Sequence, residues 1–381
     1  MAVGDPNLYF SRDTKVYLVQ GANVWEIPVL NGFTFTQATN TSEITLAEMS
    51  DSTGTSRRGR QMFNDSLAPA AWSFSTYVRP YLVTGSPNRV RAVEEPLWAN
   101  FIANNTYTPA TPAWASGVTY GPTSTDFDFS ASNKTTLGTF DLIFVLGAGK
   151  ASSANYAVSE VTTIYRVQNA SINEVSIGFD INGIATLAWS GNGATLKELT
   201  SFDGSTAITT ALTATNNFVR NRLTQLTMTS SVSGSSKTYL VTLTGGTITL
   251  TNNLTYLTPE QLGQVNVPLG HVTGARTIGG SFTCYLDEKT NGSIDLIEDL
   301  QNATTVTQNH FAMDFYIGGK AGGDLPIAPG MQFKIPNAHL TVPAIDTGDV
   351  ISMSVDFAAL PTTIDNTNEI TAVRYAGIVP A

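Results

Sequence analysis

The sequence predicts a mainly β fold built from two tandem homologous domains, and three observations predict it. Only 13% of the 381 residues are charged, and Thr, Ser, Asn and Gly are abundant. Thr is β-branched and favours strands, whereas Asn and Gly favour turns. Many short segments alternate large and small residues with the period of two that a strand requires. The chain is also longer than the ~250 to 300 residues at which one core stops growing, so at least two domains are expected.

The two halves of the chain repeat similar segments in the same order. In each half an alternating strand is followed by a second one, a short helical pattern, a strand that runs into a glycine turn, and closing strands. The matched segments are NGFTFT (31–36) with GGTITL (245–250), SFSTY (73–77) with SFTCY (281–285), VEEPLWANFI (93–102) with GSIDLIEDL (292–300), FVLGAGK (144–150) with FYIGGK (315–320), and NASINEVSI (169–177) with NAHLTVPAI (337–345).

These matches predict a duplication. At the offset of the last pair, Leu187 and Trp189 align with Val355 and Phe357. Matched blocks in a constant order are the mark of a repeat. We therefore expect two homologous β-rich domains at residues 1–200 and 201–381, each with a short helix.

A long connection separates the two matched strands of the first half, at about residues 40–72. Connections of this length in a compact domain are usually functional or disordered, and its apolar residues argue against disorder. Met, Phe and Arg are enriched in interface cores, so we predict an arm that contacts another subunit. The alternative is that the segment packs over its own domain. The residues assigned to the contact are Arg57, Arg58, Arg60, Met62, Phe63, Asn64, Asp65, Leu67 and Trp72.

The charge of the chain excludes some classes of function. The formal net charge is −10, which argues against a conventional nucleic-acid binder but suits a surface past which DNA slides without adhering. Cys284 is the only cysteine, so no intrachain disulfide can form. Neither an export signal nor a membrane-spanning segment is expected.

No pattern of catalytic or metal-binding residues is found. The three histidines have no ligand spacing, and GAGKAS (147–152) departs from the phosphate-loop pattern. Asp126 and Asp128 could form a carboxylate pair, but they lack a nucleophile or partner acid, so surface charge is the favoured interpretation. We expect no enzyme, no cofactor and no metal. A polysaccharide-degrading enzyme would need such a pair in an aromatic cleft.

Four longer segments carry a resemblance to a known family: RRGRQMFNDSLAPAAWSFSTYVRPY (57–81), ATLAWSGNG (185–193), GGTITLTNNLTYLTPE (245–260) and TGARTIGGSFTCYLDEKTNGS (273–293). Together they resemble the major tail tube protein of long-tailed bacteriophages, in its duplicated two-domain form and without the immunoglobulin-like domain that some relatives carry. The resemblance implies two tandem β-sandwich or barrel domains, each with a short flanking helix, in a fold related to the tubes of contractile tails and type VI secretion.

The resemblance also implies an assembly. Three two-domain subunits would form a pseudo-sixfold ring, and stacked rings would form a tube in the virion tail, assembled in the host cytoplasm, through which DNA is ejected into the host without specific binding. The arm would bridge rings. The implied partners are further copies of the chain, a tape-measure protein and tail-terminator or initiator proteins, with a sheath protein left open and no membrane. The alternative is a fibre or adhesin module that binds a host surface through aromatics such as Trp114 and Tyr120.

Overall fold

The computed structural model confirms the mainly β fold. It describes residues 8–44, 61–85, 87–103, 105–129, 137–159, 161–208, 217–230, 236–257, 268, 270–302, 311–364 and 366–377. Two α-helices lie within these ranges, α1 (Glu95–Ile102) and α2 (Ser293–Asn302), one in each half of the chain. Neither is long and apolar enough to cross a membrane, nor is any other described helical segment.

The strands of the first half are β1 (Lys15–Gln20), β2 (Asn23–Ile27), β3 (Thr34–Thr36), β4 (Thr39–Ile44), β5 (Gln61–Leu67), β6 (Ala70–Tyr77), β7 (Pro80–Val83), β8 (Arg89–Ala92), β9 (Tyr107–Thr108), β10 (Ala113–Trp114), β11 (Val118–Tyr120), β12 (Ser124–Asp128), β13 (Phe140–Leu146), β14 (Asn155–Ala157), β15 (Thr163–Asp180), β16 (Thr186–Gly193), β17 (Thr195–Leu199) and β18 (Ser201–Asp203). Those of the second half are β19 (Gln225–Ser230), β20 (Lys237–Leu240), β21 (Leu243–Thr251), β22 (Leu254–Leu257), β23 (Gly270–Thr273), β24 (Thr277–Tyr285), β25 (Phe311–Ile317), β26 (Gly330–Leu340), β27 (Ala344–Asp346), β28 (Ser352–Ala359) and β29 (Ala372–Ala376).

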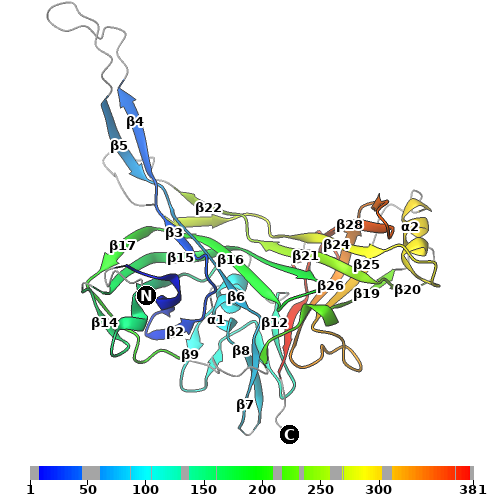
Figure 1. Ribbon diagram of the computed structural model, residues 1–381, viewed down its shortest axis with the longest axis horizontal. Helices are drawn as coiled ribbons and strands as arrows, with labels where there is room; N and C mark the ends of the chain where they lie inside the picture. Colours follow the sequence, from blue (N-terminus) through cyan, green and yellow to red (C-terminus); the bar gives the residue numbers. More distant parts are fainter. Residues whose placement is uncertain are drawn as a thin grey trace, which may run out of the picture.

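One antiparallel sheet runs through both halves of the molecule (Figure 1). Four strands of the first half lie in the order β3, β6, β16, β15. The sheet continues through β21, β24 and β28 of the second half and ends at β26 and β27. We call this set of strands the long sheet.

Two strand pairings join the halves. In the long sheet β15 pairs with β21, from Glu174 opposite Thr251 to Asp180 opposite Gly245. Elsewhere β12 pairs with β29. The predicted domain division at residue 200 remains a prediction, although β18 pairs back to β14 and so extends the first half past that position.

Strand pairing in the second half repeats that of the first, register included. The pair formed by β13 and β15 contains a bulge, because Phe140 lies opposite Ala170 but Leu142 lies opposite Val167. The pair formed by β25 and β26 contains a bulge at the same point, with Phe311 opposite Ala338 and Met313 opposite Ile335. A second repeated pairing is that of β3 with β6 and of β21 with β24. In it Thr34 lies opposite Ser73, and Thr247 lies opposite Ser281. The repetition supports the predicted duplication.

One part of the predicted alignment between halves is wrong. Phe74 lies opposite Trp189, and its counterpart Phe282 lies opposite Val355. Trp189 therefore corresponds to Val355 rather than to Phe357, the next residue on the same face of β28. A strand pattern repeats every two residues, so a shift to the next residue on one face leaves the pattern of apolar residues unchanged.

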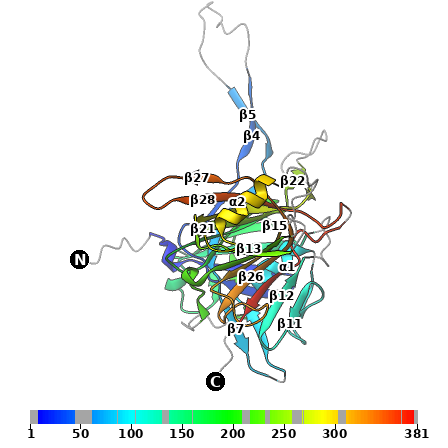
Figure 2. The ribbon, with the colours of Figure 1, turned by 90° about the vertical axis from the view of Figure 1, so that its right-hand side faces the viewer.

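The core is continuous across the two halves, with Trp98 of α1 at its centre. The Trp98 ring lies 5.0 Å from that of Trp189 and 6.5 Å from that of Phe333, measured between centroids. Its Nε1 donates a hydrogen bond of 2.7 Å to the hydroxyl of Tyr375 in β29. All residues of α1 are buried, whereas α2 lies at one edge of the molecule and exposes Ile294 and Glu298 (Figures 1 and 2).

Candidate functional site: a polar sheet face and a projecting hairpin

The long sheet has one apolar face and one face of small polar side chains. Alternation along each strand separates the two. On β6, for example, Trp72 and Phe74 are buried in the core, whereas Ser73 and Ser75 lie on the opposite face. We call the opposite face the polar face. It carries Thr34, Thr36, Ala71, Ser73, Ser75, Ser176, Gly178, Thr186, Ala188, Ser190, Asn192, Thr247, Thr249, Thr251, Thr277, Gly279, Ser281, Thr283, Ser354 and Ala358.

Hydroxyl groups on the polar face bond to one another across the strands. The Thr34 and Ser73 hydroxyl oxygens lie 2.8 Å apart, and those of the equivalent pair Thr247 and Ser281 lie 3.5 Å apart. Such cross-strand pairs stabilise neighbouring strands and satisfy part of their own hydrogen-bonding capacity. The surface they leave is polar but uncharged.

The charged residues on the polar face are acidic. Glu174 and Asp180 of β15 and Asp356 of β28 lie on it. The described segments that pair within the long sheet place no Lys or Arg there, since Arg166 of β15 and Lys334 of β26 lie on the segments that pair with β13 and β25. The Glu174 carboxylate accepts a hydrogen bond of 3.5 Å from Thr251 on the neighbouring strand. Because carboxylates repel phosphate and these segments carry no Lys or Arg to neutralise it, this face lacks the cations that hold a nucleic-acid backbone.

A hairpin of β4 and β5 projects well beyond the body of the molecule (Figures 1 and 2). It occupies the position of the predicted arm. Met62 and Phe63 are 58% and 52% exposed. Such exposure is unusual for large apolar side chains, and the one strand that pairs with β5 in the described structure is β4.

The other predicted contact residues fall in three places. Asn64 and Asp65 are exposed on β5, where Asp65 accepts a hydrogen bond from the Ser42 hydroxyl, and Leu67 is half-buried at the base of the hairpin. Arg57, Arg58 and Arg60 lie outside the described residues. Trp72 does not belong to the exposed set, because its side chain on β6 is 2% exposed and packs against Phe74 and Phe140. Its assignment to the contact is wrong.

A second hairpin, of β22 and β23, was not recognised in the sequence. It connects β21 to β24 as β4 and β5 connect β3 to β6, and Leu257 and Val272 are 48% and 50% exposed on it. The Tyr256 hydroxyl lies 3.0 Å from two backbone oxygens of the first half, Asn169 O and Asn192 O, and its single proton serves both acceptors. Burial raises the pKa of Tyr256 to about 12, so it remains a donor. The alternation of Leu254, Tyr256 and their neighbours was the available signal.

The residues considered for catalysis have structural partners. Asp126 accepts two hydrogen bonds, of 2.7 and 2.6 Å, from the guanidinium of Arg374 across the junction of the halves. Trp114 and Tyr120, expected as exposed aromatics, both donate to the buried carboxylate of Glu95, and Trp114 is only 5% exposed. That expectation is wrong, because a buried carboxylate needs donors and takes these two from the aromatic rings.

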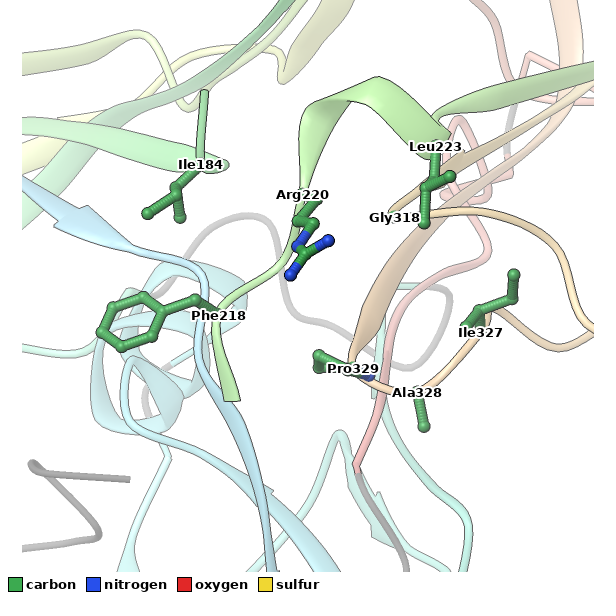
Figure 3. A pocket seen from close by; sticks show the side chains of 8 residues that line it. All are labelled: Ile184, Phe218, Arg220, Leu223, Gly318, Ile327, Ala328 and Pro329. Carbon is green, nitrogen blue, oxygen red and sulfur yellow. The ribbon is translucent and has the colours of Figure 1, made fainter. Parts of the chain in front are cut away.

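One pocket lies between the halves (Figure 3). It has a volume of about 590 Å³, and its lining includes Phe218, Ile327 and Pro329. Arg220 is the one charged residue that lines it, so it holds neither an acid nor a nucleophile. Within the described part of the chain, no group of His, Cys, Asp and Glu is arranged to hold a metal ion.

Comparison with known proteins is consistent with a structural role. No family model matches the chain. The chain is 29% identical over 374 residues to tail tube protein pb6 of Escherichia phage T5, and the match covers 95% of this chain and 75% of that protein. The similarity runs along nearly the whole chain and, combined with the mainly β fold, supports the resemblance to phage tail tube proteins that the sequence predicts.

Proposed function

We propose that the chain is the subunit of a tail tube whose copies, three to a ring, stack to form the channel for DNA ejection into the host. The observation that carries the proposal is the long sheet, which passes from one half of the chain into the other without interruption. Equivalent strands follow in the same order in each half. The step that relates the halves within one chain can therefore be repeated between chains.

The polar face is proposed to line the channel. DNA carries one negative charge per ~1.7 Å of helix axis, and any protein cation near it would replace counterions and bind. Glu174, Asp180 and Asp356 supply only negative charge. Small hydroxyl side chains make up most of the rest of the face, and its tyrosines, Tyr77 and Tyr285, lie at the ends of β6 and β24. Such a wall repels DNA weakly and evenly, which favours passage over binding.

The β4–β5 hairpin is proposed to bridge one ring to the next. Met62 and Phe63 are exposed on β5, a strand of the projecting hairpin (Figure 1), and burial against a neighbouring copy would remove both from water. The contact includes Asn64, Asp65 and Leu67, and we extend it to Arg57, Arg58 and Arg60. Tape-measure, terminator and initiator proteins are proposed as the further partners.

The alternative of a fibre or adhesin module has lost one of its two supports. Thr- and Asn-rich strands suit it as well as they suit a tube, but of its exposed aromatics Trp114 is buried and the hydroxyl of Tyr120 is bonded to Glu95.

Negative-stain electron microscopy of the purified chain, alone, after concentration and with an initiator complex, tests the proposal. Rings or hollow tubes with threefold or pseudo-sixfold symmetry are the expected result. A chain that remains monomeric even with the initiator complex, or isolated trimers that bind a receptor without stacking, would contradict it.

A further inference from the structure

We propose that each ring is closed by antiparallel pairing of β27 of one copy with β3 of the next copy, with Ala344 opposite Thr36 and Ile345 opposite Phe35. The inference rests on the proposed ring. It adds the two surfaces that meet and the register in which they meet.

The template is the junction inside the chain. There β15, which ends the first half of the long sheet, pairs with β21, which begins the second half. Ser176 lies opposite Thr249 on the polar face, and Ile177 lies opposite Ile248 on the core face. Both isoleucines have no exposed surface, so the junction is as well packed as the interior of either half.

β3 is the counterpart of β21. Each is the first strand of its half of the long sheet, and the Thr34–Ser73 pair repeats in the Thr247–Ser281 pair. Phe35 therefore corresponds to Ile248 and Thr36 to Thr249.

β27 is the counterpart of the part of β15 that pairs with β21. The match of NAHLTVPAI (337–345) with NASINEVSI (169–177) places Ile345 at the position of Ile177. Strand pairing agrees, since Ile177 lies opposite Leu187 and Ile345 opposite Met353. Leu187 and Met353 are themselves equivalent in the corrected alignment.

Both strands have an open edge in the described structure. β3 pairs with β6 alone and β27 with β28 alone, within the residues that are described. Ile345 is 53% exposed, although its counterpart Ile177 is fully buried. An open edge with an exposed apolar residue is a template for another strand.

The transferred register is chemically consistent. Ile345 and Phe35 would meet on the core face, and Ala344 and Thr36 would meet on the polar face. Asp346 would lie opposite Thr34, so the seam would continue the acidic and hydroxyl character of the polar face. The partner that fits these edges is a second copy of this chain.

Cysteine crosslinking tests the register. Thr36→Cys and Ala344→Cys are combined in one chain, because directly opposed residues of antiparallel strands have Cα atoms about 4.5 to 5.5 Å apart, within the range of a disulfide. The thiols are joined by oxidation in one sample and by a short bismaleimide in a parallel sample. The bismaleimide can join the two thiols in either a hydrogen-bonded or a non-hydrogen-bonded pair of opposed residues. The matched control is Ser176→Cys with Thr249→Cys, the equivalent pair inside the chain. Cys284 is buried and remains in all variants.

The expected result is two-chain and three-chain species on a non-reducing gel for Thr36→Cys with Ala344→Cys. Their yield should exceed that of either single variant about tenfold or more, because pairing holds the thiols at a high effective concentration. The control should crosslink within one chain. Tubes seen by electron microscopy without interchain crosslinks would overturn the seam and leave the proposed function intact. Interchain crosslinks without rings would support the seam and overturn the proposed function. A chain that neither crosslinks nor assembles would overturn both the seam and the proposed function.

Discussion

At the scale of single residues, the junction between the halves depends on buried and half-buried polar groups with specific partners. Trp98 donates to Tyr375, and Arg374 forms a bidentate pair with Asp126. Each of these contacts joins strands or helices far apart in sequence. Removing one partner leaves the other desolvated without its hydrogen bond, which costs more than the bond itself contributes.

Tyr375→Phe is expected to lower the free energy of unfolding by about 1 to 3 kcal/mol, because it leaves the buried Trp98 Nε1–H without an acceptor. Urea unfolding followed by tryptophan fluorescence measures the change. Tyr285→Phe is the control: Tyr285 is 38% exposed, and its loss should cost less than ~0.5 kcal/mol. Equal effects of the two substitutions would show that the Trp98 hydrogen bond contributes nothing to stability.

Cys284 is expected to be unreactive in the folded chain. Its side chain has no exposed surface, and burial raises the pKa of the thiol to about 12, so the nucleophilic thiolate is scarce near neutral pH. An aromatic disulfide reagent at about pH 8 should label it only after denaturation. Fast labelling of native protein would contradict this.

The same shift implies a pH dependence of stability. The folded-state pKa of Cys284 is raised, so its contribution is fully present below the unfolded pKa and is lost as pH rises toward about 12. Cys284→Ala should remove this part of the alkaline loss, measured as the difference in unfolding free energy between the two chains across that range.

At the scale of elements, the two hairpins differ from the strands around them because their side chains lack a core to pack against. Met62→Ser with Phe63→Ser is expected to leave the thermal unfolding temperature nearly unchanged, since both residues are already exposed. Tube formation should be lost or tubes should be much shorter, while single rings persist. Electron microscopy of the variant beside Ile364→Ser, a change at a fully exposed residue outside the hairpin, separates the two effects. Tubes of ordinary length would remove the hairpin from the ring-to-ring contact.

The sequence allowed the β class, a helix in each half and the position of the arm to be predicted, because each depends on local patterns. Alternation in SFSTY assigns Ser73 and Phe74 to opposite faces without any knowledge of neighbours. It does not fix which partner lies beside each strand. The shift between Trp189 and Phe357 therefore remained beyond it, since it depends on pairing between distant segments. The burial of Trp72 could have been predicted, because alternation places Trp72 on the same face as Phe74.

The acidic character of the polar face could not be predicted from the sequence either. Glu174 and Asp356 are far apart along the chain, and they lie on one face only because β15, β21, β24 and β28 are neighbours in the long sheet. The net charge of −10 was visible from the start, but its placement depends on the order of the strands.

At the scale of the whole molecule, the proposed ring has two kinds of seam. The seam inside the chain adds the pairing of β12 with β29 and the burial of α1 to the pairing of β15 with β21. The seam between copies would have the pairing of β27 with β3. It would lack the second pairing, because among the described residues no counterpart of β9 to β12 follows α2. The seam between copies should therefore be the weaker one, so that rings dissociate into intact chains.

The proposed channel makes a prediction that depends on the whole assembly. Ser190→Lys with Ser281→Lys places cations on the polar face of each half, where the described strands have none. Tubes of this variant should retain short duplex DNA at low salt about tenfold or more better than unsubstituted tubes, and the retention should fall steeply as salt rises, because binding replaces counterions on the phosphates. Cosedimentation of labelled duplex with pelleted tubes measures it. Ser190→Gln with Ser281→Gln is the matched control, since Gln adds similar bulk without charge. If unsubstituted tubes retain DNA as strongly as the lysine variant, the polar face does not line the path of the DNA, and its lack of cations must have another cause.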